Sequence, residues 1–327
     1  MISVFFPSDG TYQGRIISPD EEIPANAVWI DVLSPETAEL ELLEHELKIE
    51  MPTKNEMWKN HVLNRLYMED DVAYMTAAVI NKVDTPYPNT GSITFILTPR
   101  SLITIHDVSP TSFRNFSQRL SKRAAATQLS TPAHILEGLL EEMITRVAYN
   151  SEIVVDTLDE LSHHIFDSEL IKNNARNTSQ LMKVVLKRLG TAADLNSKIN
   201  ESLHTITRML HFFKQIPSSS SEIDSKIDML ITDTSALTTQ TAFLSDKITL
   251  QLDATLGMIN VEQNLIMKLF SVVSVFLMPP TLISSIYGMN FEFMPELKMW
   301  FGYPVALSLM ALCGLIPYIY FRRKGWL

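Results

Sequence analysis

Two long apolar runs near the end of the chain limit its possible folds more than any other feature. They cover residues 269–288 and 301–321, and neither contains an Asp, Glu, Lys or Arg residue. An α-helix of roughly 20 residues spans the hydrocarbon core of a bilayer, which is about 30 Å thick. The alternative, in which both runs are core helices of a soluble domain, leaves the short connector and the charged tail unexplained. The sequence therefore predicts two transmembrane helices.

The positions of the basic residues predict how these two helices are oriented. Lys268 precedes the first run and residues 322–324 are Arg, Arg and Lys, whereas the connector 289–300 contains only Lys298. Because Lys and Arg favour the cytoplasmic side, both ends of the membrane region should be cytoplasmic and the connector external. The start of the chain lacks the charged region and the apolar stretch of a signal peptide, so residues 1–268 are expected to stay in the cytoplasm.

The first part of the chain, residues 1–130, has the pattern of a mixed α/β domain. Residues 27–33 form a β-rich run, and residues 92–97 and 101–108 predict the two strands of a hairpin. A hydroxyl residue followed by proline favours a helix start, because the hydroxyl caps the helix and proline fits its first turn. Such pairs predict helix starts at Ser34-Pro35, Ser109-Pro110 and Thr131-Pro132.

After this domain the pattern becomes helical throughout. Residues 131–217 predict two long antiparallel helices with a break near residues 167–170. A stalk helix should then cover residues 218–268 and continue into the first apolar run, because no proline occurs from Glu222 to Met278. One helix of about 65 residues would be roughly 100 Å long. Its own small domain cannot bury so long a helix, so the pattern predicts an oligomeric stalk that leads into the membrane.

The composition excludes several classes of function. The formal net charge of −10 and the lack of a basic cluster argue against nucleic-acid binding. The sequence has no phosphate-binding glycine loop, no zinc-type cysteine pair and no nucleophile motif, and Cys313 is its only cysteine. We therefore expect neither an enzyme nor a catalytic cofactor. The acidic charge has two explanations: a solvated surface, or carboxylates of neighbouring subunits that face each other and bind a hard divalent cation.

A narrow line of amides, hydroxyls and thioethers follows one face of the helix that contains the first apolar run. We call this line the polar stripe. Its members are Asn260, Asn264, Met267, Ser271, Ser274, Met278, Thr281 and Ser285. The stripe has two explanations: close packing between membrane helices, where Ser and Thr are common, or the lining of a pore. Two spans per chain cannot enclose a pore, so the second explanation requires several copies around an axis.

Four motifs near the end of the chain match a known family. They are YGMN at 287–290, MPPT at 278–281, FEFMPEL at 291–297 and the basic ending RRKGWL at 322–327. The first contains the Gly-Met-Asn signature of the CorA divalent-cation transporters, and the chain resembles that family. The preceding α/β domain and long helices agree with the family in layout but contain no diagnostic motif.

The resemblance implies a homopentamer with a funnel-shaped cytoplasmic part, in which the first span of each chain lines one central pore. It implies a selectivity filter of Gly288, Met289 and Asn290. The pore lining that it implies below the filter consists of Thr281, Met278, Ser274, Phe270, Met267 and Asn264. The family pattern thus has Phe270 where the polar stripe has Ser271, and both assignments stay open. Asp253 matches an acidic ring at the inner mouth and is a candidate for a regulatory metal site.

The connector suits a hydrated magnesium ion. Mg²⁺ gives up its waters reluctantly. The carbonyl oxygen of Asn290 can accept hydrogen bonds from those waters, whereas a carboxylate would hold the ion. Gly288 is expected to end the helix so that Asn290 faces the axis. Glu292 and Glu296 would raise the cation concentration at the external mouth, and loop solubility explains each of them equally well.

These expectations lead to one functional hypothesis and two alternatives. The chain should be a channel-like importer of Mg²⁺, with cobalt and nickel as further cargo, in the inner membrane of the cell. Cytoplasmic Mg²⁺ bound between subunits should close it, and its partners should be copies of itself, membrane lipid and divalent cations. A zinc transporter of the same superfamily is the first alternative, and the two connector glutamates favour magnesium. A membrane-tethered signalling or scaffold protein is the second, and the polar stripe argues against it.

Overall fold

The computed structural model describes most of the chain. The residues outside this description are 9–10, 19–20, 53–65, 84, 86–87, 123–130, 167–177, 217–220, 290–293, 296–298 and 326–327. The chain divides into two compact units. The first contains Met1–Asn173 and Val184–Leu252, and the second contains Asn174–Lys183 and Asp253–Leu327.

The first unit contains a mixed seven-stranded sheet within the described residues. The strands are β1 (Ile2–Ser8), β2 (Thr11–Ile17), β3 (Trp29–Leu33), β4 (Leu66–Glu69), β5 (Val72–Asn81), β6 (Asn89–Leu97) and β7 (Leu102–His106). Their spatial order is β2-β1-β3-β7-β6-β5-β4. Strands β3 and β7 are parallel, and the other neighbouring pairs are antiparallel. The predicted hairpin is confirmed as β6 and β7, and the α/β class of this region is confirmed with it.

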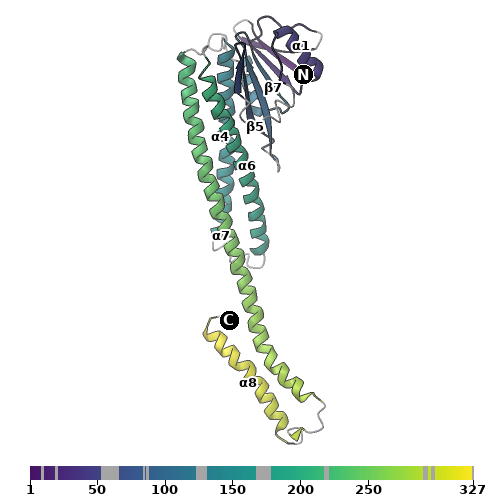
Figure 1. Cartoon of the computed structure of the whole chain (residues 1–327). Helices are drawn as coiled ribbons and strands as arrows, with labels where there is room; N and C mark the ends of the chain where they lie inside the picture. Colours follow the sequence, from purple (N-terminus) through teal and green to yellow (C-terminus); the bar gives the residue numbers. More distant parts are fainter. Residues whose placement is uncertain are drawn as a thin grey trace. The chain divides into compact units, whose positions relative to one another are not determined.

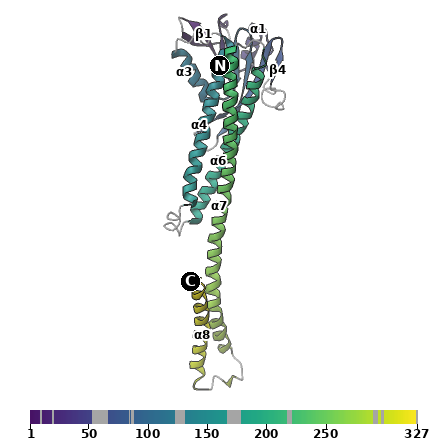
Figure 2. The ribbon, with the colours of Figure 1, turned by 90° about the vertical axis from the view of Figure 1, so that its left-hand side faces the viewer.

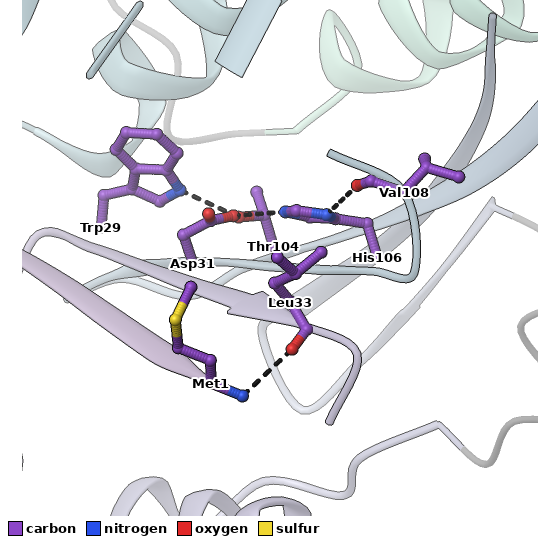
Figure 3. A network of polar contacts seen from close by, with 7 residues as sticks. All are labelled: Met1, Trp29, Asp31, Leu33, Thr104, His106 and Val108. Atoms are coloured by element: carbon purple, nitrogen blue, oxygen red, sulfur yellow. Dashed lines mark hydrogen bonds and ion pairs between the residues drawn. The ribbon is translucent and has the colours of Figure 1, made fainter. Parts of the chain in front are cut away.

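A buried polar network joins the two parallel strands at the centre of the sheet (Figure 3). The indole nitrogen of Trp29 donates to Thr104 Oγ1 at 3.0 Å, and that hydroxyl donates to Asp31 Oδ1 at 2.6 Å. His106 Nε2 lies 2.7 Å from the same carboxylate oxygen. Its Nδ1 donates to the carbonyl of Val108, because a carbonyl oxygen can only accept. The network therefore links β3 to β7 and fixes the chain that leaves β7.

Helices α1 (Thr37–Leu47) and α3 (Thr111–Lys122) differ slightly from their predicted starts. The predicted start of α1 at Ser34-Pro35 is wrong. Glu36 is the N-cap instead, and it forms a capping box with Glu39 that satisfies the first amides. The start of α3 lies directly after Pro110 rather than at it.

Long helices follow the sheet as predicted. They are α4 (Pro132–Phe166), α6 (Thr178–Phe213) and α7 (Ser221–Tyr287). Pro132 is the first residue of α4, which confirms the third predicted start. Arg188 near the start of α6 makes two hydrogen bonds of 2.6 Å to Glu160 near the end of α4, so the two helices are antiparallel, as both ribbon views show (Figures 1 and 2). The predicted break at residues 167–170 lies outside the described residues.

Helix α6 supplies hydrogen bonds to β5 in the sheet. Ser202 Oγ donates to the carbonyl of Ala78 at 2.7 Å. The Ala78 amide donates to Thr205 Oγ1 at 2.9 Å, and Thr205 Oγ1 donates in turn to the Ser202 carbonyl. Ala78 faces Ser92 of β6 on its other side. Two hydroxyls of a helix therefore take the place that a neighbouring strand would have at this point of β5.

Replacing Thr205 by valine should destabilise the cytoplasmic part by about 1–3 kcal/mol, because valine has nearly the same shape but leaves the buried Ala78 amide without an acceptor. Thermal unfolding of the full chain in detergent measures the change. The matched control is Thr207→Val, since the Thr207 hydroxyl donates only to the Leu203 carbonyl of its own helix. Equal losses of stability in the two variants would contradict the role of Thr205.

The second unit contains α7 from Asp253 onward and the helix of the second apolar run, so both predicted membrane segments lie in it. Helix α7 has 67 residues and continues through the first run, and α8 (Gly302–Arg323) contains the second. At 1.5 Å per residue, α7 is roughly 100 Å long, which confirms the predicted long helix. Among the described residues, these two helices are long and apolar enough to cross a bilayer. Only 6% and 11% of their most apolar segments are buried, so lipid or other chains can cover them.

Candidate functional site

Helix α8 covers one side of the end of α7, and both ribbon views show the two helices side by side (Figures 1 and 2). Gly314 of α8 faces Phe276 of α7, because a Cβ atom at Gly314 would lie 3.4 Å from the Phe276 ring, an ordinary van der Waals distance. Val272 on α7 and Ala306 on α8 are buried. The partly buried residues of the same α7 face are Pro279, Pro280, Ile283 and Tyr287.

The polar stripe lies on the opposite side of α7. Successive residues of an α-helix are about 100° apart around its axis. On this basis Met267, Ser274, Met278 and Thr281 lie within about 40° of the direction that points away from the α8 contact. All four are exposed, with 64% exposure for Met267 and 68% for Met278. Within the described residues, the stripe therefore does not serve packing against the second span of its own chain.

Phe270 and Ser271 border this exposed face on its two sides. Each lies about 50° from its centre, and both side chains are exposed. The geometry of one chain thus gives neither residue the better position, and both remain predictions for the lining. Asn264 lies farther out, about 70° from the centre, and is also exposed.

Two hydroxyls of the exposed face use their protons within α7, so they can only accept hydrogen bonds from other molecules. Ser271 Oγ donates to the Met267 carbonyl at 2.8 Å, and Thr281 Oγ1 donates to the Leu277 carbonyl at 2.7 Å. A hydroxyl has one proton and two lone pairs, so these side chains retain lone pairs that can accept hydrogen bonds. Water molecules around a cation direct their hydrogens outward. The exposed face of α7 can therefore bind the hydration shell of a cation.

The end of α7 agrees with the sequence, which predicted that Gly288 ends this helix. The helix ends at Tyr287, and the Gly288 amide donates to the carbonyls of Ser284 and Ser285 at 3.0 and 3.2 Å. Gly288 is not in the left-handed conformation expected of a glycine that ends a helix. A Cβ atom at this position would lie 3.3 Å from the Ser284 carbonyl oxygen, which accepts the Gly288 amide in the last turn of the helix.

The predicted filter and connector residues are only partly described. Gly288 and Met289 are exposed at the end of α7, and the Met289 amide donates to the Ile286 carbonyl at 3.2 Å. Asn290, Glu292 and Glu296 lie outside the described residues, so their roles remain predictions from the sequence.

A comparison with family models decides which family these features belong to. The model described as "CorA-like Mg2+ transporter protein" matches residues 24–323, which is nearly the whole chain. The chain belongs to the CorA family. This result confirms the resemblance of its C-terminal motifs and extends the match through the sheet and the long helices.

Relatives and solved structures agree with membership of the CorA family. A magnesium transport protein CorA of Haemophilus ducreyi is 32% identical over 317 residues, which cover 96% of this chain and 97% of that protein. The complete structure of the CorA magnesium transporter from Methanocaldococcus jannaschii has a TM-score of 0.76 and 20% identity, and covers 100% of this chain and 99% of its own. The ZntB cytoplasmic domain from Vibrio parahaemolyticus has a TM-score of 0.55 and 13% identity, over 79% of this chain and 97% of its own.

Asp253, the candidate for a regulatory site in this CorA-family chain, is exposed on α7. Within the described residues of one chain, no group of three or more His, Cys, Asp or Glu side chains is arranged to hold a metal ion. A site completed by a neighbouring copy would not appear in one chain. Asp253 therefore remains a prediction, and the sequence offers no further signal for its partners.

Proposed function

We propose that this chain is a magnesium transporter that moves hydrated Mg²⁺ along the exposed polar face of α7. The observation that carries the proposal is the position of the polar stripe on the side of α7 opposite α8, where it is available to an ion pathway. The full-length relatives named as magnesium transport proteins support the choice of ion. Cobalt and nickel remain proposed as further cargo.

Zinc is the alternative cargo within the same superfamily. The likeness to the ZntB domain concerns the fold alone, because the identity is 13%. The connector residues Glu292 and Glu296 and the named relatives favour magnesium. A signalling or scaffold protein would have no use for an uncovered polar face on a membrane helix, which argues against that alternative.

Flux into vesicles tests the function directly. The purified full chain is reconstituted into lipid vesicles, and Mg²⁺ and Zn²⁺ influx are compared under the same membrane potential. We expect Mg²⁺ influx well above that of protein-free vesicles, and little Zn²⁺ influx. Zinc influx without magnesium influx would favour the alternative, and the absence of both would reject transport of these ions.

The functional protein should be a homo-oligomer, most simply a pentamer. Each chain supplies two spans, and α8 covers only one side of α7, so one copy cannot surround an ion pathway. Mass measurement of the purified protein in mild detergent tests this prediction. A functional monomer or dimer would contradict it.

The proposed topology follows from the basic residues at the span ends. The two helices would cross the inner membrane, with both termini cytoplasmic and the connector 289–300 external. The cytoplasmic part would then consist of a sheet domain (1–130), a helical pair (131–217) and a stalk (218–268). The membrane part would consist of the two spans (269–288 and 301–321), followed by the cytoplasmic tail (322–327).

Cytoplasmic Mg²⁺ is proposed to close the pathway. A doubly charged ion gains about 4.6 kcal/mol on crossing 100 mV, from roughly 2.3 kcal/mol per charge, which corresponds to more than a thousandfold accumulation. Transport therefore has to stop as internal Mg²⁺ rises. Carboxylates of neighbouring subunits repel when bare, and a bound Mg²⁺ would bridge them and favour a closed state. Asp253 and acids of the stalk are candidates for this site.

Millimolar Mg²⁺ should protect the stalk and its contacts from protease, because the bridged closed state exposes less of them. Removal of Mg²⁺ with a chelator should expose the same segments, and digestion patterns of the assembled protein measure the difference. Sodium chloride at the same ionic strength is a suitable control, because a monovalent cation does not bridge carboxylates in this way. Identical patterns with and without Mg²⁺ would leave this mechanism without support.

A further inference from the structure

The first turns of α7 are attached to the rest of the helical bundle by a small group of contacts. Ile223, Ile227 and Leu230 are buried against the bundle. Lys214, directly after α6, makes an ion pair of 2.5 Å with Asp228. Lys226 makes a second ion pair, to Glu137 of α4 at 3.6 Å. These contacts attach the first turns of α7 to α4 and to the residue that follows α6.

The partner of Lys226 on α4 is a buried carboxylate. The Glu137 side chain is 7% exposed, whereas the Lys226 side chain is 43% exposed and also lies 3.7 Å from Glu222 of its own helix. Burial of a charge is unfavourable unless partners compensate it. The charged groups that face Glu137 are Lys226 from α7, Arg119 from α3 and Glu141 from α4. The charge of Glu137 is thus only partly compensated.

Protonation of Glu137 and protonation of the nearby His134 both act against the positive charge of Lys226. Burial raises the pKa of Glu137, and the charge of Lys226 opposes this shift. Burial also lowers the pKa of His134, as does the charge of Lys226, while Glu222 acts against the shift. His134 additionally contacts Thr131 Oγ1 at 2.7 Å. As the pH falls, Lys226 therefore loses an attractive carboxylate and gains a repulsive imidazolium.

We propose that Glu137, His134 and Lys226 form a latch that ties the start of α7 to α4, and that acidification of the cytoplasm opens this latch and increases Mg²⁺ influx. Glu137 acts as a positioning residue for α7, since it acts through its ion pair with Lys226. An opened latch loosens the first turns of a helix that continues without interruption to Tyr287. The effect on influx rests on the proposed function, in which the pathway stays closed as long as the long helices keep their positions.

When the pH falls, protonation of Glu137 and protonation of His134 change the stability of the folded state in opposite directions. A buried acid with a raised pKa makes the folded state relatively more stable as the pH falls, because the folded state binds the proton more tightly. A half-buried histidine with a lowered pKa makes the folded state less stable over the same change in pH. The two effects offset each other, so the latch can open while the bundle stays folded.

Hydrogen exchange of the full chain in detergent tests the latch without reference to transport. Exchange of residues 221–230 is compared at about pH 7.5 and about pH 5.5, after correction for the intrinsic pH dependence, in the wild type and in Glu137→Gln. We expect acidification to raise exchange of this segment about threefold or more in the wild type. Glu137→Gln should show raised exchange already at the higher pH and a smaller response to acid. Its unfolding temperature should be unchanged or higher, because an amide is less costly to bury than a carboxylate.

The matched control is Glu152→Gln, which neutralises an exposed carboxylate on the same helix and should behave like the wild type. Lys226→Met is the second variant, and it should release the segment in the same way if Glu137→Gln does not fold. In vesicles that contain inhibitory Mg²⁺, Glu137→Gln should transport faster than the wild type at the higher pH. A wild-type response to pH in Glu137→Gln, in exchange or in influx, would overturn the latch. A wild type that moves no Mg²⁺ would reject the proposed function and leave the exchange result to decide on the latch.

Discussion

Replacing Asn290 by alanine should abolish Mg²⁺ uptake while the protein still assembles in the membrane. Mg²⁺ gives up its waters reluctantly, so the filter has to recognise the hydrated ion. A ring of amide oxygens at this position would accept hydrogen bonds from the ion's water molecules. Alanine removes the acceptor and leaves the helices intact, because the residue follows the last turn of α7. Uptake into vesicles and the mass of the purified assembly measure the two parts of the prediction.

A second substitution at the same position separates charge from hydrogen bonding. Asn290→Asp keeps an acceptor but adds a charge that would hold the ion, so its uptake should be slow rather than absent. Asn89→Ala, at the exposed start of β6, is the control for an amide lost elsewhere. Normal uptake by an assembled Asn290→Ala protein would refute the role of this residue.

A cysteine at Ser274 should allow a positively charged thiol reagent to block transport almost completely. Ser274 lies near the centre of the α7 face that points away from α8, so a bulky charged group there would occupy the proposed pathway. The single native thiol, Cys313, is first replaced by serine, so that only the introduced cysteine reacts. Mg²⁺ influx before and after treatment measures the block.

The neighbouring residue provides the control for Ser274. Val273 is also exposed, at 45%, but lies about 110° from the centre of the same face. Val273→Cys should be protected by lipid or by another chain, and its influx should survive treatment. Equal inhibition of the two variants, or none in either, would contradict the assignment of the polar stripe to the pathway.

Local patterns in the sequence were enough to predict the elements that carry the function. The two apolar runs and the lack of proline before Met278 predicted both membrane helices and the long α7. The β-rich runs around residues 98–100 predicted the β6–β7 hairpin, because both strands are adjacent in the sequence. The polar stripe was visible for the same reason, since helix periodicity alone places its members on one face.

Contacts between distant residues could not be predicted in this way. The hydroxyls of Ser202 and Thr205 bond to Ala78 across more than a hundred residues, and no local pattern indicates that pairing. The burial of Glu137 is likewise a result of helix packing, because a glutamate in a charged helix is usually exposed.

One local prediction failed because a neighbouring interaction was stronger. Glu36 and Glu39 form a capping box that starts α1, in place of the expected Ser34-Pro35 pair. Gly288 follows Tyr287, the last residue of α7, which agrees with the predicted end of this helix. The pair Pro279-Pro280 does not end α7, although it removes two backbone donors in the middle of the helix.

The hydrogen bonds between α6 and β5 have a consequence for synthesis of the protein. Ala78 leaves the ribosome 124 residues before Ser202 and 127 before Thr205. At about 5–20 residues per second, its amide and carbonyl wait roughly 6–25 s for their final partners. During that time β5 presents polar groups with which a strand of another nascent chain can pair. The backbone groups of Ala78 are thus covered only by a helix that is made much later. Truncated products that end before α6 retain these unpaired groups and should aggregate more readily.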